Sequence, residues 1–288
     1  MKKLKSYKII NIIKSLLLIS AIGVIVYFLV EFLSFILNPG YAKFSALYGL
    51  FSAVFYILLG TLLGPKIVLA SVGARPLEEH PRYEEVREIV EELSKEAKIP
   101  IPKLYYFVSN DINAFATGLT PGNACIAITT GALKYLNREE LAGVLGHEIG
   151  HIKHFDMMYM TITSVLVGLV SFIANWMIYS LFWSSDERPA WVNIIAILVA
   201  ILTPIVATII QLAISREREY LADLFSAELN GGPDGLISAF RKIQIVNTGD
   251  IPYNEAIEPL YFVSVEELFS THPPIEKRIQ RLLEVFEQ

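Results

Sequence analysis

The segment from His147 to His151 has the residue types and the spacing of a metal-dependent hydrolase site. It reads His-Glu-Ile-Gly-His, inside a stretch whose pattern predicts a helix. Side chains four residues apart lie on the same face of a helix, so His147 and His151 can bind one metal ion together. Glu148 then stands beside the ion, where a carboxylate can act as general base for a water that the metal activates. This is the pattern of a zinc protease, although so short a motif also recurs by chance.

A catalytic zinc ion needs three protein ligands and one open position. The single cysteine, Cys125, is expected to be a small buried hydrophobic residue rather than a ligand. Glu219 is the best candidate for the third ligand, because it directly follows an apolar run. Asp223, one helical turn later, is expected to accept the outer ring N–H of a ligand histidine and to fix its tautomer. The alternative is that Glu219 and Asp223 only belong to a solvated charged face.

Further residues could complete such a site. A hydrolase of this type needs a donor that stabilises the oxyanion, beyond the metal itself. The candidates for this catalytic role are His272, Arg278 and Tyr220. The sequence Thr-His-Pro-Pro around His272 is equally typical of the start of a helix.

A strand-like segment precedes the metal motif and contains Asn113, Ala114 and Phe115. Zinc proteases commonly bind the substrate as an added strand along a sheet edge. These three residues are therefore candidates for substrate binding. An ordinary core strand is an equally good interpretation of the sequence alone.

The composition indicates that much of the chain lies in lipid. Hydrophobic residues make up 53% and charged residues only 18% of the chain, with a mean hydropathy of +0.48, whereas soluble domains carry about 25% charged residues. Four apolar runs have about the length of a membrane span: residues 16–37, 44–63, 157–183 and 192–214. The first run is too long for the apolar part of a cleaved signal peptide. The lysine-rich N-terminus favours a cytoplasmic location for both termini and for the active site.

These features predict a mainly α fold with a small β-sheet, in an integral membrane protein with four transmembrane helices. The cytoplasmic protease domain is expected to be zincin-like, of the gluzincin type. A helix is expected over residues 81–98, strands over 104–108, 112–117 and 125–129, and a further helix from Arg138, capped by Asn137 and Glu140. The domain boundaries follow: residues 1–72 hold the first two transmembrane helices, 73–156 the first part of the protease, 157–215 the other two transmembrane helices, and 216–288 the second part.

The order of these motifs resembles that of the HtpX family of membrane zinc metalloproteases, which is related to the CAAX prenyl endopeptidases. The motifs follow one another in this order: two apolar runs, Asn-Ala-Phe-Ala-Thr-Gly, His-Glu-x-x-His, two more apolar runs, Arg-Glu-x-Glu-Tyr-x-Ala-Asp, and Thr-His-Pro-Pro with a later arginine. The resemblance implies one zinc ion held by His147, His151 and Glu219, with Glu148 catalytic. It also implies His272 and Arg278 in the active site and quality control of damaged proteins in a prokaryotic cytoplasmic membrane.

The expected function is thus a zinc-dependent membrane endopeptidase that cleaves misfolded or damaged membrane proteins at the cytoplasmic face. Its partners are unfolded polypeptides and the lipid bilayer. The net charge of −5 and the pI near 5.6 argue against nucleic-acid binding. One alternative is a CAAX-type prenyl-protein endopeptidase, and another is a non-catalytic membrane adaptor with a structural metal.

Overall fold

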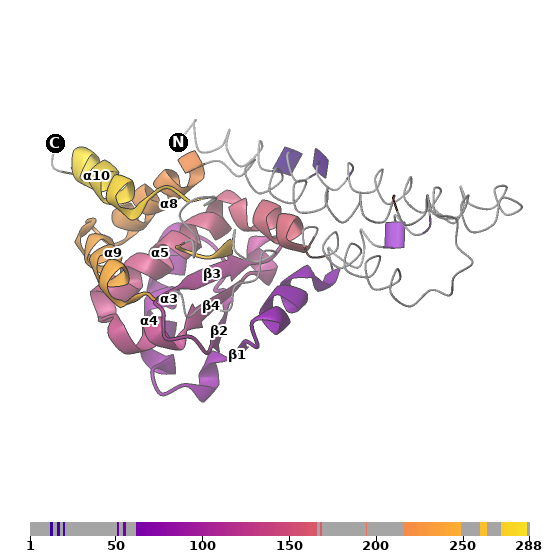
Figure 1. The fold of residues 1–288 in the computed structure, drawn as a ribbon, viewed down its shortest axis with the longest axis horizontal. Helices are drawn as coiled ribbons and strands as arrows, with labels where there is room; N and C mark the ends of the chain where they lie inside the picture. The colour runs from indigo at the N-terminus through magenta and orange to yellow at the C-terminus, as the bar shows by residue number, and fades with distance from the viewer. Residues whose placement is uncertain are drawn as a thin grey trace, which may run out of the picture.

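The computed structural model of the chain describes residues 62–165, 216–248, 260–263 and 272–286, with a few isolated positions elsewhere. The four expected transmembrane runs lie largely outside these residues. Within the described part, no helix combines the length and the apolar character needed to cross a membrane. The fold is therefore that of the expected protease domain, which two separate parts of the chain build together (Figure 1).

A small mixed sheet forms one side of this domain, with the strand order β1-β2-β4-β3. The strands are β1 (Arg75–Pro76), β2 (Lys103–Phe107), β3 (Ala114–Thr117) and β4 (Cys125–Thr129). β2 runs parallel to β4, and the other two pairs are antiparallel. The three predicted strands are confirmed to within two residues at each end, and β1 was not predicted. β3 lies at an edge of the sheet, as a substrate-binding strand must.

The helix α5 (Arg138–His154) is the central element of the domain, and most of its residues are buried. It begins with the predicted capping box: Asn137 Oδ1 accepts from the Glu140 N–H at 2.9 Å, and Glu140 Oε2 accepts from the Asn137 N–H at 2.8 Å. Lys242 and Ser238 also bind the Glu140 carboxylate, at 2.6 and 2.7 Å. The start of α5 is thus tied to the C-terminal part of the chain.

The remaining helices surround α5. They include α3 (Tyr83–Ala97), the short α4 (Thr130–Tyr135), α8 (Arg216–Leu229), α9 (Asp234–Val246) and α10 (Ile275–Phe286), with the single-turn helices η2 (Leu77–Glu79) and η3 (Pro121–Asn123). In Figure 1 the strands lie on one side of α5, and α8 and α9 lie on the other. The helix predicted over residues 81–98 is confirmed as α3. α5 therefore connects the sheet with the second half of the protease.

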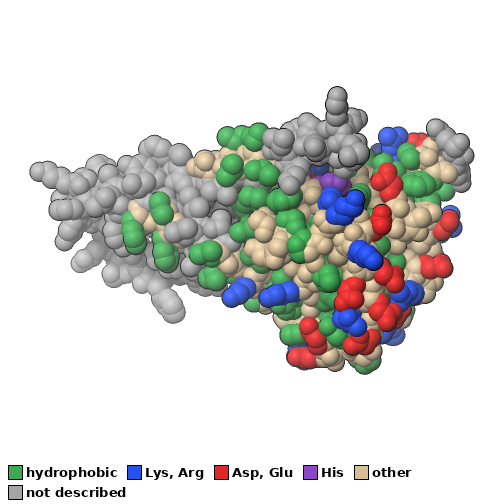
Figure 2. Space-filling view, turned by 180° about the vertical axis from the view of Figure 1, so that it is seen from behind, with side chains coloured by type: hydrophobic (Ala, Val, Ile, Leu, Met, Phe, Trp, Pro, Cys, Tyr) green, Lys and Arg blue, Asp and Glu red, His purple; other side chains and the backbone are tan. Residues whose placement is uncertain are grey.

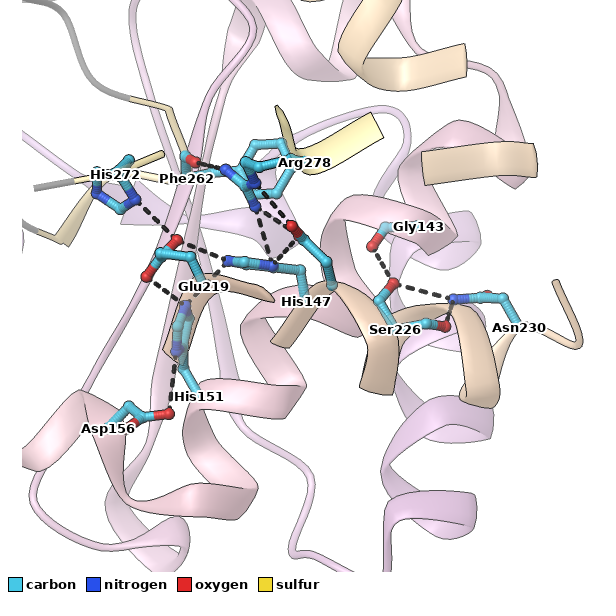
Figure 3. A network of polar contacts seen from close by, with 11 residues as sticks. Gly143, His147, His151, Asp156, Glu219, Ser226, Asn230, Phe262, His272 and Arg278 are labelled. Carbon is cyan, nitrogen blue, oxygen red and sulfur yellow. Dashed lines mark hydrogen bonds and ion pairs between the residues drawn. The ribbon is translucent and has the colours of Figure 1, made fainter. Parts of the chain in front are cut away.

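Glycines on α5 allow α8 to approach closely. A Cβ at Gly146 would lie 2.7 Å from Ser226 Oγ and 2.8 Å from Asn230 Nδ2, so any other residue would displace these two side chains of the α8 region. Ser226 Oγ also donates to the carbonyl of Gly143 at 2.5 Å (Figure 3). Glu219, Asp223 and Ser226 share one face of α8 because their spacing is four and three residues. The contact at Ser226 therefore turns Glu219 and Asp223 towards the histidines of α5.

Candidate metal centre and active site

Three ligand atoms converge between α5 and α8, from His147, His151 and Glu219 (Figure 3). His147 Nε2 lies 2.9 Å from His151 Nε2 and 3.6 Å from Glu219 Oε2. His151 Nε2 lies 3.5 Å from Glu219 Oε1. Ligand atoms of a tetrahedral zinc ion are about 3.3 Å apart, given zinc–ligand bonds of about 2.0–2.1 Å. The three separations lie close to this value, and the donor set of two imidazoles and one carboxylate suits zinc.

The ring of His147 is held from behind by Asp223 and Arg278. Asp223 Oδ1 lies 2.8 Å from His147 Nδ1, the position expected of a group that fixes the tautomer. The guanidinium of Arg278 binds both oxygens of Asp223, through Nε at 2.8 Å and Nη2 at 2.6 Å. Burial alone raises the pKa of Asp223, but Arg278 outweighs it and lowers the pKa below its usual value. Asp223 is thus kept ionised as an acceptor for His147 Nδ1–H.

Arg278 itself differs from the expectation of an oxyanion donor. Its remaining terminal nitrogen, Nη1, donates to the Phe262 carbonyl at 2.8 Å, and the guanidinium stacks on the rings of Phe240 and Phe262. It also approaches His147 from the Nδ1 side, which is the side away from the ligand atoms. These contacts support a role in positioning Asp223 and His147. The sequence could not distinguish the two roles, because both place an arginine in the active site.

Of the other two candidate donors, His272 lies in the site. Its Nδ1 is 2.7 Å from Glu219 Oε2, whereas the other oxygen of that carboxylate, Oε1, lies 3.5 Å from His151 Nε2. Both side chains are almost fully buried. Tyr220 is half-buried and makes no hydrogen bond to this cluster among the residues that the structure describes. His272 is therefore the better candidate to act beside the metal.

The ring of His151 has a weaker support, which the sequence did not reveal. Asp156 Oδ2 lies 3.3 Å from His151 Nδ1, and Asp156 Oδ1 lies 3.6 Å from Arg218 Nη1. The Arg218 side chain is 3% exposed and stacks over the ring of Tyr159. Within the described ranges, none of its nitrogens has a hydrogen-bond partner. The sequence places Asp156 just after the metal motif and an arginine directly before Glu219, but neither the pairing of Asp156 nor the burial of this arginine could be predicted from the pattern.

Glu148 has the environment that a general base needs. It is 1% exposed, and no side chain in the described part of the chain donates a hydrogen bond to its carboxylate. Burial raises the pKa of Glu148 to about 7, although His151 opposes the rise. A carboxyl group with a pKa near neutrality can both take and return a proton. His147, His151, Glu219 and His272 are buried as well.

The predicted substrate residues are engaged by another part of the chain. Asn113 Nδ2 donates to the Val263 carbonyl at 2.8 Å, and the Val263 N–H donates to Asn113 Oδ1 at 3.2 Å. The Phe262 N–H donates to the Ala114 carbonyl at 2.8 Å. Phe115 packs against aromatic rings in a buried cluster. This arrangement therefore argues against a direct role of Asn113, Ala114 and Phe115 in binding substrate. The sequence could not predict these contacts, because they join residues about 150 positions apart in the chain.

Comparison with known proteins places this geometry among peptidases. The model described as Peptidase family M48 matches residues 81–285. The protease HtpX homolog of Aquifex aeolicus is 44% identical over 238 residues, which cover 76% of this chain and 77% of that relative. The homolog of Pyrococcus abyssi is 42% identical over 243 residues, with coverage of 81% and 84%. The crystal structure of S. mikatae Ste24p is similar in fold, with a TM-score of 0.54 and 24% identity over 98% of this chain and 67% of that one.

Proposed function

We propose, from the premise that this chain belongs to peptidase family M48 and is an HtpX-type metalloprotease, that it cleaves misfolded or damaged membrane proteins with the help of one zinc ion. The observation that carries the catalytic part is the convergence of His147, His151 and Glu219 next to Glu148. The ligand atoms have the separations of a zinc site, and no side chain among the described residues donates a hydrogen bond to the Glu148 carboxylate. Family membership as a protease sets aside the alternative of a non-catalytic adaptor.

The residues of the chain divide the chemistry among them. A zinc ion held by His147, His151 and Glu219 would supply Lewis-acid activation of water and polarise the scissile carbonyl. Glu148 takes a proton from the attacking water and passes it to the leaving nitrogen. His272 lies beside Glu219 and is the candidate to stabilise the oxyanion.

The membrane location is supported by the apolar runs of the sequence and by one described helix. Leu62, Leu63 and Ile67 expose large parts of their apolar side chains on the helix that spans residues 62–71. Figure 2 shows hydrophobic side chains gathered at this end of the domain and charged side chains at the other end. Such a distribution suits a domain that stands on a lipid surface, with the charged end in water. The lysines at the N-terminus support the cytoplasmic side.

Glu148→Gln tests the catalytic role. The amide has nearly the shape of the carboxylate but cannot take a proton, so the variant should bind one zinc ion per chain and lose cleavage by at least about a hundredfold. Zinc content and cleavage of an unfolded membrane protein are measured on detergent-purified wild type and variant. Full activity of the variant would show that the mechanism is wrong.

Sidedness is tested with a single exposed thiol. Arg241 is exposed on α9, whereas the natural Cys125 is buried. An Arg241→Cys variant should react with a membrane-impermeant maleimide in inverted vesicles and not from outside intact cells. Labelling from outside intact cells would place the domain on the other side.

The alternative of a prenyl-protein substrate is tested by competition. A farnesylated peptide and an unfolded membrane protein are offered to the same preparation. We expect faster cleavage of the unfolded protein, and strong preference for the farnesylated peptide would favour the alternative.

A further inference from the structure

A further helix begins almost directly where α5 ends. α5 ends at His154, Phe155 alone separates the two helices, and the next helix covers residues 156–165 of the described chain. The backbone of Phe155 has a φ of 64°, a conformation that residues other than glycine rarely adopt, so α5 stops here and the chain changes direction. The direction of the helix over residues 156–165 therefore sets where Asp156 lies relative to α5.

Asp156, in the first turn of this helix, is the acceptor behind His151. Its Oδ2 lies 3.3 Å from His151 Nδ1, and its Oδ1 lies 3.6 Å from Arg218 Nη1 (Figure 3). A separation of 3.3 Å is already at the long end for a hydrogen bond, so a small displacement of Asp156 removes the contact. The orientation of His151 thus depends on an aspartate that belongs to the next helix and not to α5 or α8.

The second turn of this helix is joined to the sheet by one hydroxyl group. Thr161 Oγ1 accepts from the Gly118 N–H at 3.1 Å and forms a hydrogen bond of 3.0 Å with Thr117 Oγ1, at the end of β3. Thr161 and Thr117 are both fully buried. Apolar contacts do not depend on direction, whereas hydrogen bonds do. These two bonds therefore fix the direction of the helix relative to β3.

Another apolar helix packs against Thr161 through a glycine. A Cβ at Gly64 would lie 3.4 Å from Thr161 Cγ2 and 3.3 Å from Val165 Cγ2, so the helices over residues 62–71 and 156–165 approach each other closely here. Both helices border apolar runs of the sequence that we expect to lie in lipid. Tilting of these runs in the bilayer is thus transmitted to the domain at the level of Thr161.

The lengths involved show why this contact matters for the metal site. Thr161 follows Asp156 by five residues, which corresponds to about 7.5 Å along a helix. Transmembrane helices tilt over a range of about 0–40°. A change of only about 10° about Thr161 would move Asp156 by about 1.3 Å. Such a movement is enough to separate Asp156 from His151.

We propose that Thr161 is a positioning residue for the metal site: its hydroxyl holds the helix over residues 156–165 against β3 and thereby keeps Asp156 within reach of His151. The proposal rests on the metal-dependent function above and assigns to it a residue that lies outside the metal cluster. The alternative is that Thr161 only stabilises the fold. A residue of that kind would change the free energy of unfolding without acting through Asp156.

Zinc affinity, measured by competition with a chelator on detergent-purified protein, tests the proposal without turnover. Thr161→Val keeps nearly the same shape but lacks the hydroxyl, and it should lower the affinity about tenfold, the lower end of the range for groups that orient a metal-binding histidine. Thr161→Ser keeps the hydroxyl and should retain the affinity of the wild type. Thr163→Val is the matched control, because Thr163 is fully buried on the same helix and its hydroxyl has no hydrogen-bond partner among the residues that the structure describes. Unchanged affinity in Thr161→Val, or an equal loss in Thr163→Val, would overturn the proposal.

A double-mutant cycle shows whether Thr161 acts through Asp156. Asp156→Asn should itself lower the zinc affinity about tenfold. Adding Thr161→Val to it should then lower the affinity by less than about twofold, because two changes that act on one contact are not additive. A further tenfold loss would show that Thr161 acts independently of Asp156 and would overturn the proposal.

Thr117→Val provides a second route if Thr161→Val does not fold. It removes one of the two hydrogen bonds of Thr161 and leaves the bond from the Gly118 N–H in place. We expect a smaller loss of zinc affinity than for Thr161→Val, again absent in the Asp156→Asn background, and a loss that persists in that background would contradict the proposal. If wild type shows this binding pattern but cleaves no peptide, the proposed function fails and the positioning role stands.

Discussion

The two histidines of the metal motif are supported to different degrees. Behind His147, Asp223 lies at 2.8 Å from Nδ1, and Arg278 binds both of its oxygens and the Phe262 carbonyl. Behind His151, Asp156 lies at 3.3 Å, and Arg218 approaches it only at 3.6 Å. Each histidine thus has an aspartate and an arginine behind it, and among the described residues the contacts behind His147 are the shorter ones.

The difference follows from the segments that each support joins. The His147 support joins α5, α8, α10 and residues 260–263, so it holds distant parts of the chain together. The His151 support joins α5, the start of the next helix at residue 156 and the first turn of α8, which are all close to the expected membrane boundary. We infer that the first support carries fold stability as well as metal geometry, whereas the second mainly orients one ligand. The predictions below test this difference.

The largest effect is expected from Arg278→Ala. Removing one partner of a buried ion pair leaves the other charge uncompensated, which costs about 3–5 kcal/mol. The free energy of unfolding in denaturant and the zinc content should both fall. Arg281→Ala is the matched control, because Arg281 lies on the same helix and is exposed. An Arg278→Ala variant as stable as this control would contradict the account of the His147 support.

A smaller effect is expected from Arg218→Gln. Groups that orient a metal-binding histidine typically change metal affinity by 10–100-fold, and the lower value is expected here because the pair is loose. Zinc affinity measured by competition with a chelator should fall about tenfold, with a smaller loss of stability than for Arg278→Ala. Arg218→Lys keeps the charge and should recover part of the affinity. The exposed Arg241→Gln serves as control, and unchanged affinity in Arg218→Gln would remove the role assigned to this arginine.

Acid should act on the His147 support. The pKa of Asp223 is depressed in the folded chain, so its contribution to stability is present above the ordinary value of 3.8 and is lost as the pH falls through the lower folded value. Unfolding of wild type followed between about pH 5 and pH 2 should show this loss. Asp223→Asn should be less stable at pH 5 and should depend less on pH over that range. An identical pH dependence in both proteins would contradict the ionised state of Asp223.

Activity should depend on pH through Glu148. Its pKa is raised to about 7 by burial, and only the ionised form can take a proton. The value of kcat/KM should therefore be low at pH values below the pKa of Glu148 and should rise as the pH increases through that pKa. A rate that is constant from pH 5 to about pH 8 would separate Glu148 from proton transfer.

The sequence predicted local features well and long-range features poorly. The start of α5, the strand β4 and the pair of histidines depend on residues close together in the chain, where spacing and caps are informative. The closure of β3 by residues 260–263 depends on pairing between segments about 150 residues apart, which periodicity does not report. Arg278 shows the same limit: its residue type suggested a donor to substrate, but only the packing against Phe240 and Phe262 shows where its donors point.

The most direct measurement is the zinc content of Glu219→Ala beside that of Glu217→Ala. Both residues belong to the first turn of α8, but Glu217 is exposed and Glu219 is 1% exposed. If Glu219 is the third ligand, the Glu217→Ala chain should retain one zinc ion and the Glu219→Ala chain should lose it after dialysis. One tightly bound zinc ion in both variants would show that Glu219 does not hold the metal.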